Sequence, residues 1–353
     1  MAANLPTLAV VGATGIVGGV LCELLSSRKN YWGEIRLVAS PRSAGRKLTV
    51  RGEELTVAAL SAEVFDGVDV AIFDVPDEVA VEWAPVAAAR GAVVVDNSAA
   101  FRMDPDVPLV VSEINPEQVR NRPKRIIANP NCTTLVMIMA IAPLHREYGL
   151  RELVIASYQA ASGAGQAGVD ALHDQLAKVA GDRVLGSRPG NVRQAIGEEI
   201  GPFPAPLALN VVPWAGSLRD HGWSSEELKL RNDSRKILGL PDLKVSATCV
   251  RVPVITGHSV AVHATFGTEV DAADARELLR HAPGVILVDD PAADEFPMPI
   301  DAVGTDPSWV GRLRRSLDDP RALDLFITGD NLRKGAALNS AQIAELLATE
   351  FTR

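Results

Sequence analysis

The sequence lacks the features of several large classes of protein. No apolar run reaches the roughly 18 residues that a membrane-spanning helix needs, so we expect no membrane partner. The opening MAANLPTLAVVGATG has no basic segment followed by a small-residue cleavage site, which favours a cytoplasmic location. The net charge of -9 argues against a nucleic-acid partner, because nucleic acid requires a basic face. Small anionic ligands stay open, since a few local Arg and Lys side chains are enough to bind them.

Cysteine is scarce. The chain has three, Cys22, Cys132 and Cys249, and this odd, sparse set argues against a disulfide framework. No CxxC or HxxxH spacing points to a metal, so we expect no metal site. Cys22 lies in the helical stretch GGVLCELL and Cys249 in the strand-like SATCVRVPV. Both are typical of small buried hydrophobic residues, which leaves Cys132 as the thiol of interest.

The 353 residues exceed what one hydrophobic core normally supports, so we expect two domains. In the first part, short and nearly continuous apolar strands alternate with helical stretches. This alternation predicts an α/β fold with a Rossmann-type, doubly wound parallel sheet. The expected strands are residues 7–13, 34–40, 68–75, 92–98, 107–114 and 124–130.

The character of the chain changes after the apolar stretch that follows Cys132. Longer alternating strands such as LRELVIASYQAAS, with helices between them, predict an α+β domain built on a mixed sheet. The amphipathic helix at 338–351 is expected to return to the first domain. The predicted domains are therefore residues 1–130 plus 331–353, and residues 131–330. The long strands of the second domain also suggest a homodimer interface.

A glycine-rich turn follows the first strand. VVGATGIVGG places Gly12, Gly15 and Gly18 between a strand and a helix, where backbone N–H groups can approach a pyrophosphate. The spacing is GxxGxxG rather than GxGxxG, and a tight turn that merely needs glycine is the alternative. Because the segment follows a strand and opens a helix near the start of the chain, we predict a dinucleotide site.

The end of the second strand indicates which dinucleotide binds. An NAD site places an acidic residue there to hold the ribose hydroxyls. VASPRSAGR instead has Ser40, Arg42 and Ser43, which suit a 2′-phosphate that a carboxylate would repel. We therefore predict NADP as the cofactor. The alternative is that Arg42 is only a solvated loop charge.

Cys132 lies at the first turn of a predicted helix, after Asn-Pro-Asn. A helix N-terminus favours the thiolate, so this cysteine is a candidate nucleophile rather than a core residue. Asn129 or Asn131 would cap the turn. A nucleophile needs a base within reach. Of the six histidines, the sequence pattern alone does not decide between His258, at the entry to a strand, and His221, in a loop.

Eight segments, in order along the chain, together resemble bacterial aspartate-β-semialdehyde dehydrogenases. Each segment is modest by itself, but the set covers nearly the whole chain. The segments are GATGIVG, ASPRSAG, NSAAFRM, NPNCTT, SYQAASGAGQAG, EELK with SRKILG, TCVRVPVITGHS and GDNLRKGAALNSAQIAELL.

The resemblance implies the NADPH-dependent reduction of L-aspartyl 4-phosphate to L-aspartate 4-semialdehyde, with release of phosphate. This step lies on the route to lysine, through diaminopimelate, and to threonine and methionine. The resemblance also implies a homodimer in which residues 1–130 plus 331–353 bind NADP and residues 131–330 carry catalysis and dimerisation.

The resemblance further assigns the site residues. Cys132 would be the acyl acceptor, His258 the general acid/base and Gln159 the group that orients the acyl substrate. Arg251 would bind the substrate carboxylate and Glu226 its ammonium group. The implied phosphate ligands are Arg102, Asn131 and Lys229. The implied NADP ligands are Gly12, Ala13, Thr14, Gly15, Ile16, Val17, Ser40, Arg42, Ser43, Ser162, Gly163 and Asn331.

The residue types are compatible with these roles. Arg251 can hold a carboxylate through two parallel hydrogen bonds. Glu226 and Lys229 are one helical turn apart and share a face. Without the resemblance, this pair would be read as an ordinary surface ion pair and Arg102 as a solvated loop residue. Glu226 is preferred to Glu227 only because of its spacing to Lys229.

Three alternative functional assignments fit the sequence less well. N-acetyl-γ-glutamyl-phosphate reductase, the alternative within related enzymes, typically has Gly before its cysteine and Tyr after it, where this chain has Asn131 and Thr133. Glyceraldehyde-3-phosphate dehydrogenase shares the Cys-Thr-Thr helix start but neither these glycines nor the second half. A catalytically inactive NADP-binding regulator would not need four residues that are all present together here: Cys132, Gln159, Arg251 and His258.

Overall fold

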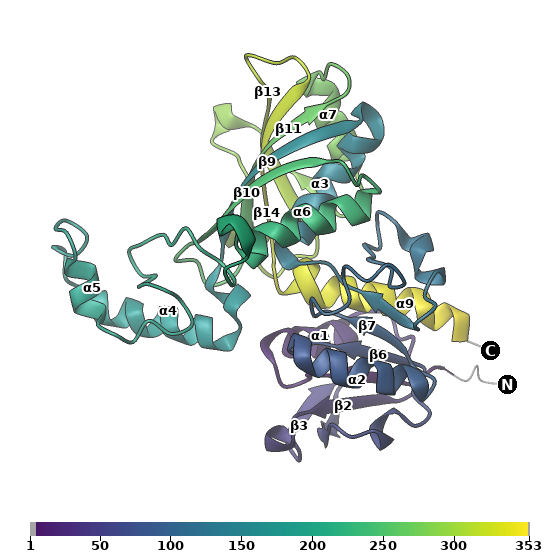
Figure 1. The fold of residues 1–353 in the computed structure, drawn as a ribbon. Coiled ribbons are helices and arrows are strands. Elements are labelled where there is room, and N and C mark those ends of the chain that lie inside the picture. The colour runs from purple at the N-terminus through teal and green to yellow at the C-terminus, as the bar shows by residue number, and fades with distance from the viewer. Residues whose placement is uncertain (1–4, 352–353) are drawn as a thin grey trace. The chain divides into compact units, whose positions relative to one another are not determined.

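The computed structural model describes residues 5–351 and divides into two compact units (Figure 1). The first unit comprises the residues up to Asn131, Lys236–Gly239 and the residues from Leu332 onward. The second unit comprises Cys132–Arg235 and Leu240–Asn331. The C-terminal segment thus joins the N-terminal one in a single unit. The division differs from the predicted domains by one residue at each boundary and by Lys236–Gly239.

A parallel sheet forms the centre of the first unit, as predicted. Its six strands lie in the order β5-β2-β1-β6-β7-β8, and β5 was not predicted. β1, β6 and β7 are buried along their whole lengths, which explains their continuous apolar sequences. The strand order reverses at β1, between β2 and β6, so a crevice is expected at their carboxyl ends. The strands are β1 (Leu8–Val11), β2 (Ile35–Ala39), β5 (Ala58–Ala59), β6 (Val70–Phe73), β7 (Val93–Asp96) and β8 (Ile126–Ala128).

Helices from both ends of the chain cover this sheet. α1 (Ile16–Ser27) and α9 (Leu338–Phe351) contact each other, and the π-helical turn η7 (Arg333–Ala337) leads directly into α9. α2 (Asp77–Ala89) packs on β6, β7 and β8. Ile343 and Leu347 of α9 are fully buried in the same apolar cluster as β1 and α1. The last helix, which was expected to return to the first domain, packs in the same unit as the N-terminal segment.

The predicted strand at 107–114 is wrong. Only Leu109 forms a bridge, to Ala128, although Val107–Val111 are buried. Pro108 lacks an N–H, and the carbonyl of Val110 accepts a side-chain N–H from Asn339. The segment therefore lies beside β8 without forming a ladder. The hairpin of β3 (Lys47–Val50) and β4 (Glu53–Thr56) was not predicted.

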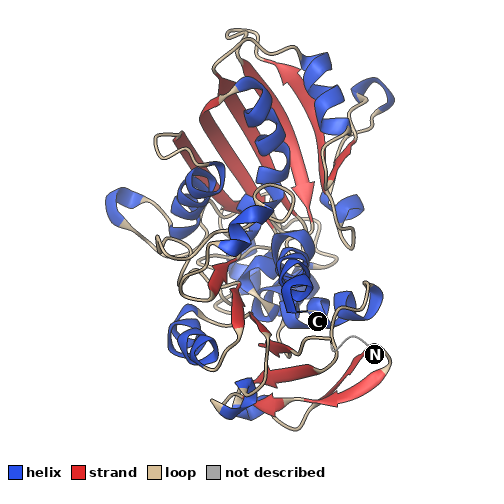
Figure 2. Ribbon diagram, turned by 90° about the vertical axis from the view of Figure 1, so that its right-hand side faces the viewer, coloured by secondary structure: helices blue, strands red, loops and turns tan. Residues whose placement is uncertain are grey.

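The second unit is built on a mixed six-stranded sheet, which confirms the predicted α+β character (Figure 2). Its order is β10-β9-β11-β14-β13-β12, with β9 parallel to β10 and antiparallel to β11. The last three strands were not predicted. The strands are β9 (Leu150–Gln159), β10 (Lys244–Arg251), β11 (His258–Phe266), β12 (Val285–Leu287), β13 (Ser308–Arg315) and β14 (Ala322–Gly329).

One face of this mixed sheet is covered by α3 (Cys132–Tyr148), which contacts β9, β11, β13 and β14. Residues 133–142 of α3 are buried, as expected for a helix that is apolar on all sides. The other face is less covered, and Val154 and Tyr158 of β9 are 45% and 40% exposed there. This alternation along β9 explains its predicted strand pattern.

The second unit contains further helices besides α3. α4 (Gln166–Val179) and α5 (Asn191–Ile196) share a small apolar cluster with the Pro-rich loop that follows them. The other helices are α6 (Ser225–Leu238), α7 (Ala272–Arg280) and α8 (Pro299–Ala302). Within residues 5–351, no helix is both long and apolar enough to cross a membrane.

Candidate active site

Three strand ends and one helix start bring the predicted catalytic residues together in the second unit. Gln159 ends β9 and pairs in register with Arg251, which ends β10. β11 runs antiparallel to β9 and begins at His258, so its first residue lies at the same edge. α3 begins at Cys132. Side chains that are up to 126 positions apart in sequence therefore meet at one edge of the sheet.

Cys132 and His258 are in contact. The Sγ atom lies 3.3 Å from Nε2 of the imidazole. On the other side of the ring, the backbone N–H of Ala160 donates to Nδ1 at 3.0 Å. Nδ1 must therefore accept, so the single proton of a neutral ring sits on Nε2 and faces the sulfur. His258, rather than His221, is the histidine placed at the thiol.

The surroundings keep His258 neutral. Its ring is fully buried, and burial, followed by the charge of Arg251, lowers the pKa of His258 from 6.5 to about 3. An imidazolium would also point an N–H on Nδ1 at the Ala160 N–H. The ring is thus a hydrogen-bond donor to sulfur, and it cannot supply the positive charge of an ion pair at neutral pH.

Arg251 supplies the positive charge instead. Burial lowers the pKa of its guanidinium, while the Cys132 thiol and Glu226 carboxylate counteract this shift. Nη1 donates to the Ala160 carbonyl at 2.6 Å. Among residues 5–351, the rest of its fork has no hydrogen-bond partner, so it is available to a ligand carboxylate.

Gly163 has no side chain, and this leaves space for the side chains of Arg251 and His258. A Cβ atom at residue 163 would lie 2.6 Å from Arg251 Nη1 and 3.0 Å from His258 Nε2. Both side chains are buried and hydrogen-bonded, so a larger residue would displace them. Steric crowding next to the reacting sulfur therefore explains why the SGAG segment has glycine at residue 163.

Gln159 and Glu226 form the polar edge of the cluster. Gln159 Nε2 donates to Thr133 Oγ1 at 3.0 Å and to Glu226 Oε2 at 3.4 Å. Glu226 Oε1 accepts from Lys229 at 2.7 Å, so the i,i+3 pair exists and also borders the site. Glu227 is used otherwise, because it forms a capping box with Ser224.

The glycine turn of the first unit has the shape of a phosphate loop. A Cβ at Gly12 would lie 2.0 Å from the carbonyl oxygen of Asp74, and one at Gly18 would lie 2.3 Å from that of Gly12. Gly15 is the N-cap of α1 and has no side chain to cover its amides. Phosphate fits such an uncovered helix start. The loop consists of Gly12, Ala13, Thr14, Gly15, Ile16 and Val17.

The predicted 2′-phosphate ligands follow β2, the strand next to β1. Ser40, Arg42 and Ser43 form or precede the short 3-10 turn η1 (Pro41–Ser43), and Arg42 is exposed. In the described part of the chain, Arg42 has no ion-pair partner. Parallel β1 and β2 end together, so Arg42 follows the same sheet edge as the glycine turn.

Ser162 and Asn331 lie in the second unit, bonded to each other. Asn331 Nδ2 and Ser162 Oγ are 3.0 Å apart, and Asn331 Oδ1 also accepts from the Gly257 N–H at 2.9 Å. Both side chains are buried. Gly257 immediately precedes His258, so this contact holds the start of β11.

Arg102 is not the solvated residue that its local sequence suggests. It is 6% exposed, and its guanidinium donates to the carbonyls of Asn129 and Asn97, at 2.8 Å each. Asn131, also buried, lies two residues beyond Asn129 and directly precedes Cys132. Asn97 and Asn129 follow adjacent strands β7 and β8. Asn97 was not singled out from the sequence, and Asn129 only as a possible cap of the turn before Cys132.

The other thiols and histidines have plain structural roles. Burial raises the pKa of Cys22 to about 11 and that of Cys249 to about 12, so both are inert core residues, as expected. His263 is bonded to Asp324 on β14, and His281 to Glu277 on α7. The contact from Ala160 to His258 was missed because a backbone amide has no sequence signature.

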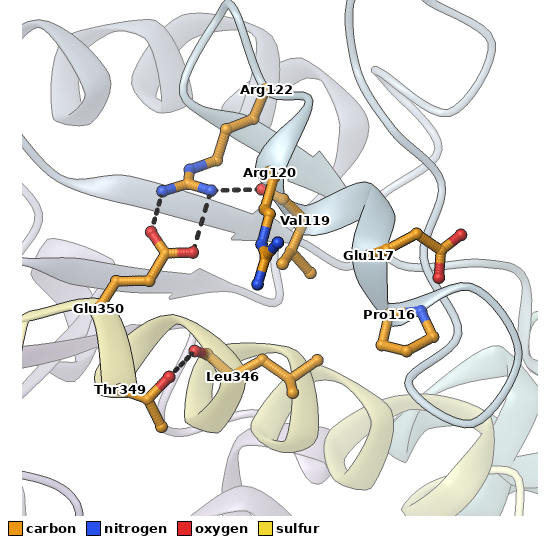
Figure 3. A pocket seen from close by; sticks show the side chains of 8 residues that line it. All are labelled: Pro116, Glu117, Val119, Arg120, Arg122, Leu346, Thr349 and Glu350. Carbon is orange, nitrogen blue, oxygen red and sulfur yellow. Dashed lines mark hydrogen bonds and ion pairs between the residues drawn. The ribbon is translucent and has the colours of Figure 1, made fainter.

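A separate cavity of about 620 Å³ lies in the first unit between α9 and η3 (Pro116–Arg120) (Figure 3). Arg122 there is paired with Glu350 and with the Val119 carbonyl. None of the predicted site residues lines this cavity. It does not contribute to the cluster around Cys132.

Comparisons with known proteins agree with the geometry. Residues 7–122 match the family model "Semialdehyde dehydrogenase, NAD binding domain", and residues 141–334 match "Semialdehyde dehydrogenase, dimerisation domain". The cofactor is therefore a nicotinamide dinucleotide. An aspartate-semialdehyde dehydrogenase of Corynebacterium melassecola is 50% identical over 97% of this chain and 99% of its own length. One of Bacillus subtilis is 42% identical over 96% of each.

Solved structures give the same result. Aspartate semialdehyde dehydrogenase II of Vibrio cholerae, complexed with ASA, is 36% identical, with a TM-score of 0.89 over 98% of this chain and 99% of that chain. The Candida albicans enzyme with NADP is 25% identical, with a TM-score of 0.74 over 98% and 99%. The chain belongs to the aspartate-semialdehyde dehydrogenase family of oxidoreductases.

Proposed function

We propose that this chain catalyses the NADPH-dependent reduction of L-aspartyl 4-phosphate to L-aspartate 4-semialdehyde and phosphate. The observation that carries the proposal is the 3.3 Å contact between the Cys132 sulfur and the Nε2 of a neutral His258. The first unit would bind the cofactor and the second would carry the chemistry. The reaction belongs to the biosynthesis of lysine, threonine and methionine.

Cys132 begins the reaction as a thiolate. The start of α3, the nearby Arg251 charge and the N–H of His258 all favour the negative sulfur. The sulfur attacks the acyl carbon, the bond from carbon to the phosphate oxygen breaks, and phosphate leaves with the electron pair. A thioester remains on Cys132. A nucleophile that forms such an intermediate splits one difficult step into two.

His258 acts as a hydrogen-bond donor to the reacting oxygen. The bound nicotinamide cofactor supplies the hydride that reduces the thioester. The Nε2–H of His258 stabilises the oxygen that becomes negative and holds a proton within reach of it. When the bond from carbon to sulfur breaks, the aldehyde leaves and the sulfur returns as a thiolate beside the same N–H.

The remaining side chains hold a substrate that carries both charges. The open fork of Arg251 suits the α-carboxylate, and Glu226 suits the ammonium group. Gln159, held by Thr133 and Glu226, would orient the acyl group. Arg102, Lys229 and Asn131 would bind the phosphate.

NADP, rather than NAD, is proposed as the cofactor. Exposed Arg42 and the Ser40 and Ser43 hydroxyls follow β2 at the sheet edge that carries the glycine turn. The Candida albicans relative was solved with NADP. Ser162, Gly163 and Asn331 are the further NADP ligands that the resemblance implies.

We also propose that two copies pair through the open face of the mixed sheet. Val154 and Tyr158 are 45% and 40% exposed there, and the Tyr158 ring packs at a tilt against Phe326 of β14, with centroids 6.0 Å apart. Apolar side chains that are exposed side by side on a sheet indicate an interface. The matched dimerisation-domain model spans these strands.

Replacing the nucleophile Cys132 and the hydrogen-bond donor His258 tests the proposed chemistry. The Cys132→Ser variant should keep its fold and lose nearly all phosphate-dependent NADPH formation from aspartate semialdehyde. The His258→Ala variant should lose about 10²- to 10⁴-fold in kcat. His281→Ala, an exposed histidine, is the matched control and should match wild type. Near-normal turnover in the Cys132→Ser variant would end the assignment.

His258 should also make stability depend on pH. Its pKa is about 3 when folded against an ordinary 6.5, so between these values only the unfolded state binds the proton. Wild-type stability must therefore fall as the pH drops below 6.5. From pH 8 to pH 5 we expect wild type to lose about 2 kcal/mol more unfolding free energy than His258→Asn, measured in urea. Equal losses in the two proteins contradict a neutral buried ring.

Reversing the charge of Arg42 tests the cofactor preference. The Arg42→Glu variant should raise the KM for NADPH at least tenfold and leave the KM for NADH nearly unchanged, because only NADPH has the 2′-phosphate. Steady-state kinetics with both cofactors give the answer. Arg46→Glu, a nearby exposed arginine, is the control. An equal rise for both cofactors removes the claim.

A charge on the open sheet face tests the dimer. The Val154→Glu variant should sediment as a monomer at concentrations where wild type is dimeric, because a buried unpaired carboxylate opposes association. Leu317→Glu, at a fully exposed position between β13 and β14, should remain a dimer. A dimeric Val154→Glu variant would place the interface elsewhere.

A further inference from the structure

A buried cation lies at the start of the last helix, and the proposed chemistry does not use it. Lys334 in η7 is 1% exposed. Its ammonium group donates to Glu113 and, at 2.9 Å each, to Asn339 Oδ1 and Gln342 Oε1. Burial would raise the pKa of the Glu113 carboxyl, but the charge and hydrogen bonds of Lys334 hold it below its usual value. Lys334 and Glu113 are therefore a charged pair in which the lysine is buried and the glutamate is half-buried.

A chain of three asparagine amides begins at this cation. Asn339 Nδ2 donates to Asn129 Oδ1 at 2.6 Å, and Asn129 Nδ2 donates to Asn97 Oδ1 at 2.6 Å. Asn97 Nδ2 then donates to Asp74 Oδ1 at 2.7 Å. Asn339 and Asn129 are fully buried. The chain thus connects an ammonium group to a carboxylate within the first unit.

The orientation of every amide in the chain is determined by its ends. An ammonium group can only donate, so the atom of Asn339 that faces Lys334 is oxygen. The Val110 carbonyl can only accept, so the Asn339 atom that it contacts at 2.9 Å is nitrogen. With Asn339 fixed, Asn129 must accept from it and donate to Asn97. Polar networks with each member satisfied hold a single arrangement.

This chain connects to groups at both proposed ligand sites. The carbonyls of Asn129 and Asn97 hold the Arg102 guanidinium at 2.8 Å each. Asn129 is also two residues before Asn131. At the far end, Asp74 Oδ2 would lie 3.7 Å from a Cβ at Gly15, under the glycine turn. Asn129 and Asn97 therefore have two roles. Their side-chain amides belong to the chain that Lys334 orients, and their backbone carbonyls position Arg102.

We propose that Asn339 is a positioning residue for the phosphate-binding Arg102, through Asn129. The inference rests on the proposed function, because it takes Arg102 and Asn131 as phosphate ligands. Asn339 touches neither substrate nor cofactor in this account. It fixes the Asn129 amide and, with it, the carbonyl that accepts from Arg102.

The Asn339→Asp variant tests the inference with almost no change in volume. A carboxylate at residue 339 still accepts from Lys334 but cannot donate to the Val110 carbonyl or to Asn129. In the direction that forms NADPH, the KM for phosphate should rise about tenfold or more, while kcat at saturating phosphate falls less than threefold, and the KM for aspartate semialdehyde should not change. A KM for phosphate within twofold of wild type overturns the inference.

Gln342→Ala is the matched control. It removes another hydrogen bond to Lys334, and one to Glu113, but leaves the three asparagines in place. Thermal unfolding should show a loss of stability in this variant with an unchanged KM for phosphate. If Gln342→Ala raises that KM as much as Asn339→Asp does, the effect is general loosening and the inference is wrong.

Two further measurements keep the test decisive. If Asn339→Asp does not fold, Asn339→Ala removes the same donor to Asn129 and should raise the KM for phosphate in the same way; an unchanged KM overturns the inference. If wild type forms no NADPH in a phosphate-dependent reaction, the proposed function fails by itself. The rise in Tm that phosphate causes then reports binding without turnover, and Asn339→Asp should reduce that rise. An equal rise in both proteins counts against the positioning role.

Discussion

The hydrogen bond from the Ala160 amide to His258 Nδ1 is the constraint on which the site depends. It leaves the single imidazole proton on Nε2, 3.3 Å from the Cys132 sulfur. Ala160 follows the last residue of β9, and His258 begins the neighbouring β11. The antiparallel pairing of these strands therefore determines which nitrogen of His258 carries the proton and, through it, the direction in which the ring donates its hydrogen bond.

Because His258 is neutral, other groups must provide the positive charge that stabilises the Cys132 thiolate. Arg251, whose Nη1 is held by the Ala160 carbonyl, provides the positive charge near the sulfur, and the start of α3 adds its dipole. Gly163 provides the space in which Arg251 and His258 lie close together. The short segment after β9 thus orients the His258 imidazole, binds the Arg251 guanidinium and leaves space for both side chains.

Much of this arrangement follows from local sequence. The glycine turn, the buried parallel strands, the last helix and the position of Cys132 at a helix start all rest on patterns within about 20 residues. The choice of His258 over His221 does not, because it depends on the register of β9 and β11. The local sequence around Arg102 points to a solvated loop for the same reason, because its partners Asn97 and Asn129 follow two other strands. The false strand at 107–114 had the right hydrophobicity, but a side chain of α9 takes one of its carbonyls.

The central claim is most directly tested by ¹⁵N NMR of histidine-labelled protein, with the His258 signals assigned by comparison with the His258→Asn variant. The account predicts one neutral tautomer, protonated at Nε2 and bare at Nδ1, without titration from about pH 5 to about pH 9. A ring that is protonated at both nitrogens at neutral pH would mean an imidazolium–thiolate pair. That result would contradict the account.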